Sequence, residues 1–244
     1  MNRLHPSDSV PSIASFDHTD VRQAIDRIVT LRMLTVRVGY YALLLHRPNP
    51  QGTDSPAQRD MWLESLRESV ASYGEVTELL EIGTALANVE PGISAWIYNI
   101  VRDFKVEVGM VSTMNRLTQQ IGAHALDAGP EQNARMLNHV AESRGGFYEA
   151  VASIFEALQL DLEEARSKGL RRAASSAVAL ATRLNRLERI GKHVRIVSLN
   201  ASVEAARVGD AGRGLSVIAS EFKTLAEEIT EIARDAKNDI DAFS

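Results

Sequence analysis

The chain has 244 residues, enough for one or two domains with a buried core, and it contains no cysteine. Disulfides, thiolate metal sites and a cysteine nucleophile are therefore excluded. A formal net charge of −5, without basic blocks interleaved with aromatic residues, argues against nucleic-acid binding.

The predicted elements are all helical. Residues 1–19 are rich in Ser and Pro and lack the apolar region of a signal peptide, so we expect a disordered leader. Long segments rich in Ala, Leu, Glu and Arg follow, without the alternation typical of strands. The expected helices are 20–46, 57–87, 92–126 and 131–167.

The first of these helices contains the most apolar window of the chain, residues 31–45. At about 15 residues, and interrupted by Arg32 and Arg37, it is shorter than the roughly 20 residues that span a bilayer. We therefore expect no membrane insertion and a cytoplasmic location.

Short connections predict that consecutive helices are antiparallel neighbours, so residues 20–167 are expected to form a four-helix up-down bundle. The fourth helix is expected to continue into a second domain, residues 168–244, with weak points at Gly145, Gly146 and Gly169. A helix of this kind could transmit a signal mechanically.

The second domain has the pattern of an antiparallel coiled-coil hairpin. In its returning arm, apolar residues recur at alternating spacings of three and four, which predicts a heptad seam between the arms. The expected seam comprises Leu215, Ile218, Phe222, Leu225, Ile229, Ile232 and Ala236, facing Leu180, Leu184, Leu187, Gly191, Val194, Ser198, Ala201, Ala205 and Val208. The arms also carry opposite charge, which favours this pairing.

The hairpin is expected to reverse at residues 209–214. Glycine accepts the positive φ that a tight exit from a helix requires, which accounts for Gly209, while Gly212 and Gly214 serve the reversal. Any helical hairpin could have glycines at its turn. The turn alone leaves four nearby polar residues unexplained: Asn200, Glu204, Arg207 and Arg213.

Residues 199–219, Leu-Asn-Ala-Ser-Val-Glu-Ala-Ala-Arg-Val-Gly-Asp-Ala-Gly-Arg-Gly-Leu-Ser-Val-Ile-Ala, resemble the signalling tip of bacterial chemoreceptors, the methyl-accepting chemotaxis proteins. The resemblance implies that Glu204 and Arg207 lie at contacts between receptor dimers. It also implies that Ile196, Leu199 and Val217 help to bind the chemotaxis coupling protein and the histidine kinase.

Ile196, Leu199 and Val203 follow one another at i, i+3 and i+7, so they form an apolar stripe beside the seam. This stripe could dock a partner protein or be buried in a homodimeric four-helix bundle. The segment 192–195 departs from the family pattern, which puts trimers of dimers and kinase control in doubt. No methylation site can be assigned after the tip.

Residues 30–38, Thr-Leu-Arg-Met-Leu-Thr-Val-Arg-Val, resemble the sensor bundles of nitrate sensor kinases and of the type IV pilus chemoreceptor. In that family an arginine matching Arg32 binds an anion at a dimer interface, which implies a candidate anion site at Arg32 and Arg37. The alternative is that both arginines flank a core stripe and face water or a carboxylate. No histidine pair has ligand spacing, so neither a metal nor a cofactor is expected.

Together these features predict a soluble, homodimeric, chemoreceptor-like signal transducer. Its helical bundle would be the input module, and its tip would contact the coupling protein and the kinase. The alternative is a non-sensing interaction or decoy protein that caps receptor arrays, or another partner, through the same tip. An enzyme is not expected, because the sequence offers no Ser/His/Asp set, phosphate loop or metal cluster.

Overall fold

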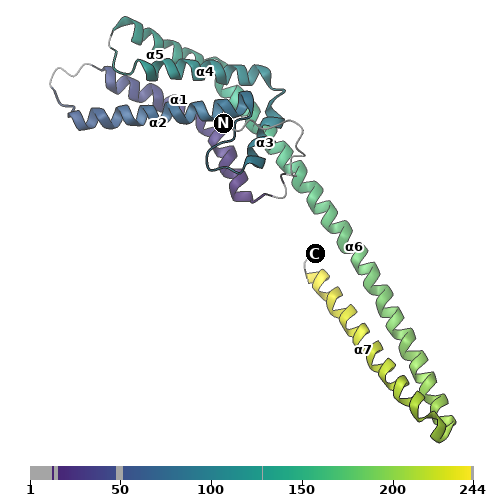
Figure 1. Cartoon of the computed structure of the whole chain (residues 1–244). Coiled ribbons are helices and arrows are strands. Elements are labelled where there is room, and N and C mark those ends of the chain that lie inside the picture. The colour runs from purple at the N-terminus through teal and green to yellow at the C-terminus, as the bar shows by residue number, and fades with distance from the viewer. Residues whose placement is uncertain (1–12, 14–15, 48–51, 128, 243–244) are drawn as a thin grey trace. The chain divides into compact units, whose positions relative to one another are not determined.

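A computed structural model describes residues 13, 16–47, 52–127 and 129–242 (Figure 1). The chain divides into two compact units, 1–166 and 167–244. Regular secondary structure in the described residues is helical, which confirms the all-α prediction. Most of the expected leader lies outside the described residues, although helix α1 already begins at His18.

The first unit contains five helices and the start of a sixth in the described part of the chain. The first two helices have side-chain N-caps: Asp17 accepts a hydrogen bond from the Thr19 amide, and Ser55 accepts one from the Gln58 amide. The bounds are α1 His18–His46, α2 Pro56–Ile82, α3 Pro91–Val101, α4 Lys105–Ala123 and α5 Pro130–Glu142.

Two predicted boundaries are wrong. The helix expected at 92–126 is split into α3 and α4 by a turn in which the Phe104 amide bonds to the Val101 carbonyl. Neither glycine nor proline marks this break in the sequence. Helix α2 ends at Ile82 rather than at residue 87, because Gly83 adopts the left-handed conformation with φ of 72°.

The first unit buries two apolar clusters. The larger gathers side chains from α1 to α4 and from the start of α6, and the smaller lies where α1, α2 and α4 meet. The fully buried members of the larger cluster include Ile28, Leu31, Tyr73, Leu79, Ile97, Met114 and Ile154.

Helix α1 is unusually apolar. It is long and apolar enough to cross a membrane by length and composition, with a mean hydropathy of 1.5 over its 18-residue window. The expectation that this window is too short is therefore corrected. In the structure, 39% of the window is buried within the fold, so α1 also contributes core residues such as Leu34 and Val38.

A kink joins α5 to α6. The segment Ser143–Phe147 is π-helical, and its two glycines leave helical geometry, Gly146 with a φ of 97°. Both were expected as a weak point, and a positive φ is what glycine tolerates. Helix α6 then runs without a break from Tyr148 to Arg207, through the second weak point expected at Gly169.

The second unit is a helical hairpin. The descending arm of α6 reverses through a 3-10 turn at Gly209–Gly212 and returns as α7, Arg213–Ala242 (Figure 1). An ion pair between Arg195 and Glu227, 3.5 Å apart, joins the arms.

The seam between the arms agrees with the prediction in part on α6 and differs from it on α7. The buried residues recur every seven positions and, apart from Leu184, are small: Leu184, Gly191, Ser198 and Ala205 on α6, all four of them predicted, and Gly212, Ala219, Ala226 and Ala233 on the returning chain. Small side chains let the helix backbones approach closely. The larger residues expected in α7's seam stay 45–67% exposed, namely Leu215, Ile218, Phe222, Leu225 and Ile232.

Candidate functional site

The three glycines at the hairpin turn meet different structural requirements. Gly209 has a φ of 66°, so it meets the requirement for positive φ. A Cβ on Gly212 would lie 2.1 Å from the Ala205 carbonyl oxygen, so the close approach of the arms excludes a side chain there. Gly214 lies in the first turn of α7, where a Cβ would meet no atom within 4 Å.

The apolar residues singled out near the turn lie on the hairpin surface. Ile196, Leu199 and Val203 of α6 and Val217 of α7 are 45–67% exposed. Asn200 is exposed as well. These side chains take no part in the small-residue seam, so a partner could reach them.

The charged residues near the turn form local pairs. Glu204 lies 3.9 Å from Arg207, and Asp210 lies 2.7 Å from Arg213, each pair within one helical turn. All four side chains are exposed, so each pair contributes little to stability and can exchange for a pair with another protein.

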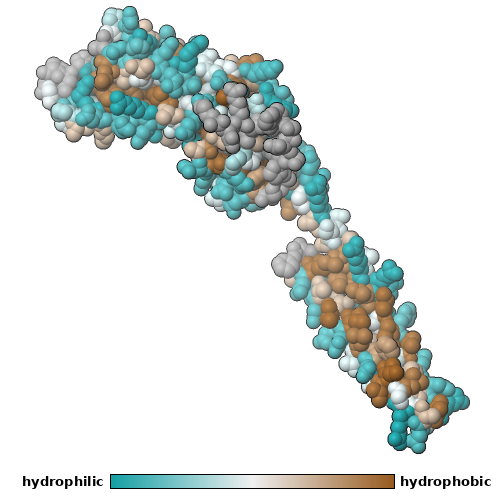
Figure 2. Space-filling view, viewed as in Figure 1, coloured by the Kyte–Doolittle hydropathy of each residue, from teal (hydrophilic) through white to brown (hydrophobic). Residues whose placement is uncertain are grey.

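Next to the stripe, the hairpin has a hollow between its arms. It encloses about 330 Å³ and is lined almost entirely by apolar atoms, including those of Val197, Ile218 and Phe222. Figure 2 shows apolar side chains in a band along the hairpin. This face has no covering element in the described chain, and sequence reasoning placed Ile218 and Phe222 inside the arm-to-arm seam. Alanines at positions 219, 226 and 233 were the missed signal.

The two arginines of the candidate anion site have separate surroundings. The Arg32 guanidinium donates to the Tyr148 carbonyl and lies 5.6 Å from the Tyr148 ring centroid, while Arg37 lies 5.9 Å from the ring centroid of Tyr41. The described contacts therefore do not bring the two guanidinium groups onto a shared site. The Nε atom of Arg32 is buried without a hydrogen-bond partner.

Two ionisable groups are deeply buried in the first unit. His139 is 2% exposed, its Nε2 lies 3.3 Å from the Thr118 hydroxyl, and burial lowers its pKa to about 4. Burial also favours the neutral form of Tyr73, so it raises the pKa of that hydroxyl. Sequence reasoning did not single out either residue. In the described part of the chain, no three His, Asp or Glu side chains cluster as metal ligands would.

Comparison with known proteins points to one family. The model of the methyl-accepting chemotaxis protein (MCP) signalling domain matches residues 109–243, more than half of the chain. The matched region begins inside α4 and therefore includes the kink as well as the hairpin. No solved structure matches.

Individual relatives match over shorter stretches. The chain is 30% identical over 130 residues to the probable chemoreceptor y4sI of Sinorhizobium fredii, covering 53% of this chain and 15% of that protein. It is 31% identical over 117 residues to the frizzy aggregation protein FrzCD of Myxococcus xanthus, covering 44% and 27%. Methyl-accepting chemotaxis protein I of Escherichia coli is 36% identical over 69 residues, covering 28% and 12%. The chain thus spans less than a third of each of these relatives.

Proposed function

Because the chain belongs to the methyl-accepting chemotaxis protein family through its signalling domain, we propose that it is a homodimeric chemotaxis signal transducer. The hairpin tip contacts the coupling protein and the histidine kinase, and the helical bundle serves as the input module. The observation that carries this proposal is the exposed apolar stripe beside the turn.

The stripe supports a protein partner because its residues are exposed although the hairpin is already paired. Ile196, Leu199 and Val203 lie on one face of α6, and the seam beside them is closed by Ser198 and Ala205. Aligned apolar side chains on a paired helix indicate an interaction surface. The charged pairs Glu204–Arg207 and Asp210–Arg213 surround it with groups that can select a partner.

The larger apolar residues of α7 support a homodimer. Leu215, Ile218 and Phe222 are about half exposed and recur at coiled-coil spacing. A second hairpin placed against this face would convert two helices into a four-helix bundle and bury them.

Signal transmission then follows the continuous helix. The kink at Gly145 and Gly146 lies inside the first unit, and α6 extends from it over 60 residues to the tip. A small shift or rotation of α6 at the kink would alter the packing of the hairpin, which is a recurrent switching device in helical proteins. We also place the protein in the cytoplasm, where both partners of the tip would be found.

Co-sedimentation with the chemotaxis coupling protein and kinase of the same organism tests this function. The wild-type chain should sediment with them, and Ile196→Asp should abolish binding because it puts a charge into the apolar stripe. Leu170→Asp is the matched control, since Leu170 is 67% exposed on the same helix but far along the chain from the turn. Equal binding by wild type and Ile196→Asp would contradict a docking role for the stripe. Complete absence of binding would contradict the proposed partners.

A further inference from the structure

The first unit contains a groove that none of the preceding functions uses. It lies between α1 and α5 and encloses about 540 Å³. Gly39, Tyr40 and Leu43 of α1 line one side, and Leu137 and Arg144 line the other. Volumes of 300–1,000 Å³ with mostly apolar walls and a few polar groups are typical of small-molecule sites.

The groove has an apolar end and a polar end. His46, at the end of α1, is hydrogen-bonded to the carbonyl of Asp127 just before α5, so the two helices run antiparallel along the groove. Leu43 therefore lies toward the start of α5, and Thr35 lies toward the kink. The eight helical steps from Thr35 to Leu43 span about 12 Å.

Positive charge gathers at the polar end. Arg144 lines the groove there, is exposed, and makes no hydrogen bond or ion pair with the described residues. Tyr148 lines the same end, and the Arg32 guanidinium lies over its ring in a cation–π contact. The Arg32 Nε atom is buried without a hydrogen-bond partner. No Asp or Glu is among the described residues that line the groove.

We propose that this groove binds an amphipathic carboxylate, with its apolar body along α1 and α5 and its carboxylate on Arg144. A guanidinium presents paired donors that suit a carboxylate, and the arrangement leaves the apolar tail against Tyr40, Leu43 and Leu137. The proposal deepens the proposed function by giving the input bundle a ligand class.

The shape of the groove favours a small molecule over a second copy of the chain. Gly39 lies in its wall, and a Cβ built there would meet no atom within 4 Å, so the space above this glycine is open. Apolar residues of α1 around it, Val36, Tyr40 and Leu43, are 56–61% exposed. A slender apolar ligand can fill such a hollow, while the exposed arginine at one end is free to pair with an anion.

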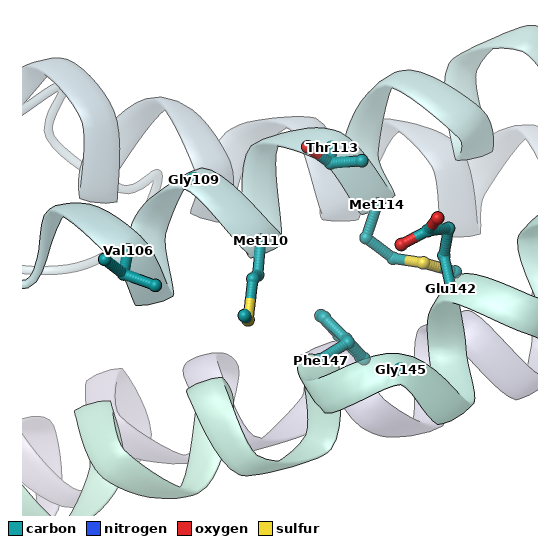
Figure 3. A pocket seen from close by; sticks show the side chains of 8 residues that line it. All are labelled: Val106, Gly109, Met110, Thr113, Met114, Glu142, Gly145 and Phe147. Atoms are coloured by element: carbon teal, nitrogen blue, oxygen red, sulfur yellow. The ribbon is translucent and has the colours of Figure 1, made fainter.

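The site is placed to act on the kink. Arg144 belongs to the kinked segment Ser143–Phe147, so a ligand that draws Arg144 toward the groove pulls on that segment directly. On the α4 side of the kink, Figure 3 shows a second cavity, about 210 Å³, between Met110 and Met114 of α4 and the Gly145–Phe147 part of the kink. This space gives the kinked residues room to move.

Calorimetry of decanoate binding to the purified full chain tests the proposal. Decanoate should bind, decan-1-ol should bind at least tenfold more weakly, and acetate should not bind. Arg144→Gln should weaken decanoate binding at least tenfold, whereas Arg144→Lys should retain part of it. Arg116→Gln is the matched control, because Arg116 is an exposed arginine of α4 outside the groove, and it should bind as wild type does.

A filling variant tests the location without removing a contact. Gly39→Leu should place its side chain in the groove and block decanoate, while Gly169→Leu, on α6 outside the groove, where a Cβ likewise meets no atom within 4 Å, should not. Undiminished binding in both Gly39→Leu and Arg144→Gln would overturn the proposal. So would a lack of decanoate binding together with a change of oligomeric state in Gly39→Leu, which would assign the face to a second copy. Because no signalling partner is present, failure here leaves the co-sedimentation result unaffected.

Discussion

Two glycines of the hairpin turn, two residues apart, have opposite surroundings. Gly212 faces the Ala205 carbonyl so closely that a Cβ would clash with backbone, whereas Gly214 faces open space within α7. The chemoreceptor resemblance includes both. Only the structure shows that the close approach of the arms requires Gly212, whereas nothing within one chain requires a glycine at position 214.

Gly212→Ala should therefore destabilise the hairpin by about 1–3 kcal/mol, because the arms must move apart to admit the methyl group. Gly214→Ala should leave stability unchanged or raise it by up to about 1 kcal/mol, since alanine is the better helix former. Chemical denaturation followed by circular dichroism measures both. Equal destabilisation by the two variants would show that the close approach at Ala205 is not what constrains Gly212.

His139 predicts a pH dependence of stability. Its pKa in the folded chain is lowered to about 4, below the value of about 6.5 expected when unfolded, so the unfolded state binds the proton first as pH falls. The contribution of neutral, buried His139 to the free energy of unfolding is complete above pH 6.5 and is lost as pH falls toward 4.

Between pH 7 and 5 the loss should be about 1–2 kcal/mol. His139→Gln should unfold with a shallower dependence on pH over that interval, because the other titrating groups remain. Urea unfolding at several pH values measures the difference. Parallel curves for wild type and variant would contradict a neutral, buried His139.

At the scale of elements, the hairpin shows what periodicity can and cannot predict. Spacings of three and four correctly indicate which face of α7 is apolar. They do not say which helix covers that face, because an arm of the same hairpin and an arm of a second hairpin produce the same pattern. The choice is made by side-chain size, since Ala219, Ala226 and Ala233 allow the close approach that Phe222 would prevent.

The two breaks in the helices of the first unit differ in how far the sequence predicts them. Gly145 and Gly146 predict the kink, because two adjacent glycines weaken a helix, and both residues leave helical geometry there. The break between α3 and α4 has no such marker in the sequence, and Val101 before it and Val111 after it both pack into the core. The tip residues came from family resemblance, while the α1/α5 groove depends on residues far apart in sequence and needed the fold.

At the scale of the whole molecule, the exposed face of α7 predicts assembly into a dimer. Phe222→Asp should weaken self-association by at least tenfold while leaving helix content intact, because the residue lies outside the arm-to-arm seam. Thr224→Asp is the matched control, since Thr224 is exposed two residues away on α7. Sedimentation equilibrium gives the association constants. A Phe222→Asp chain that associates as wild type does would exclude this face as the dimer interface.

In the proposed function, the tip transmits a signal to the kinase. The most direct measurement is the autophosphorylation rate of the chemotaxis kinase, reconstituted with coupling protein and this chain, with Ile196→Asp and Leu170→Asp in parallel. Wild type and Leu170→Asp should change the rate equally, and Ile196→Asp should not change it. A rate that is the same with wild type, with Ile196→Asp and without the chain would contradict a transducer function.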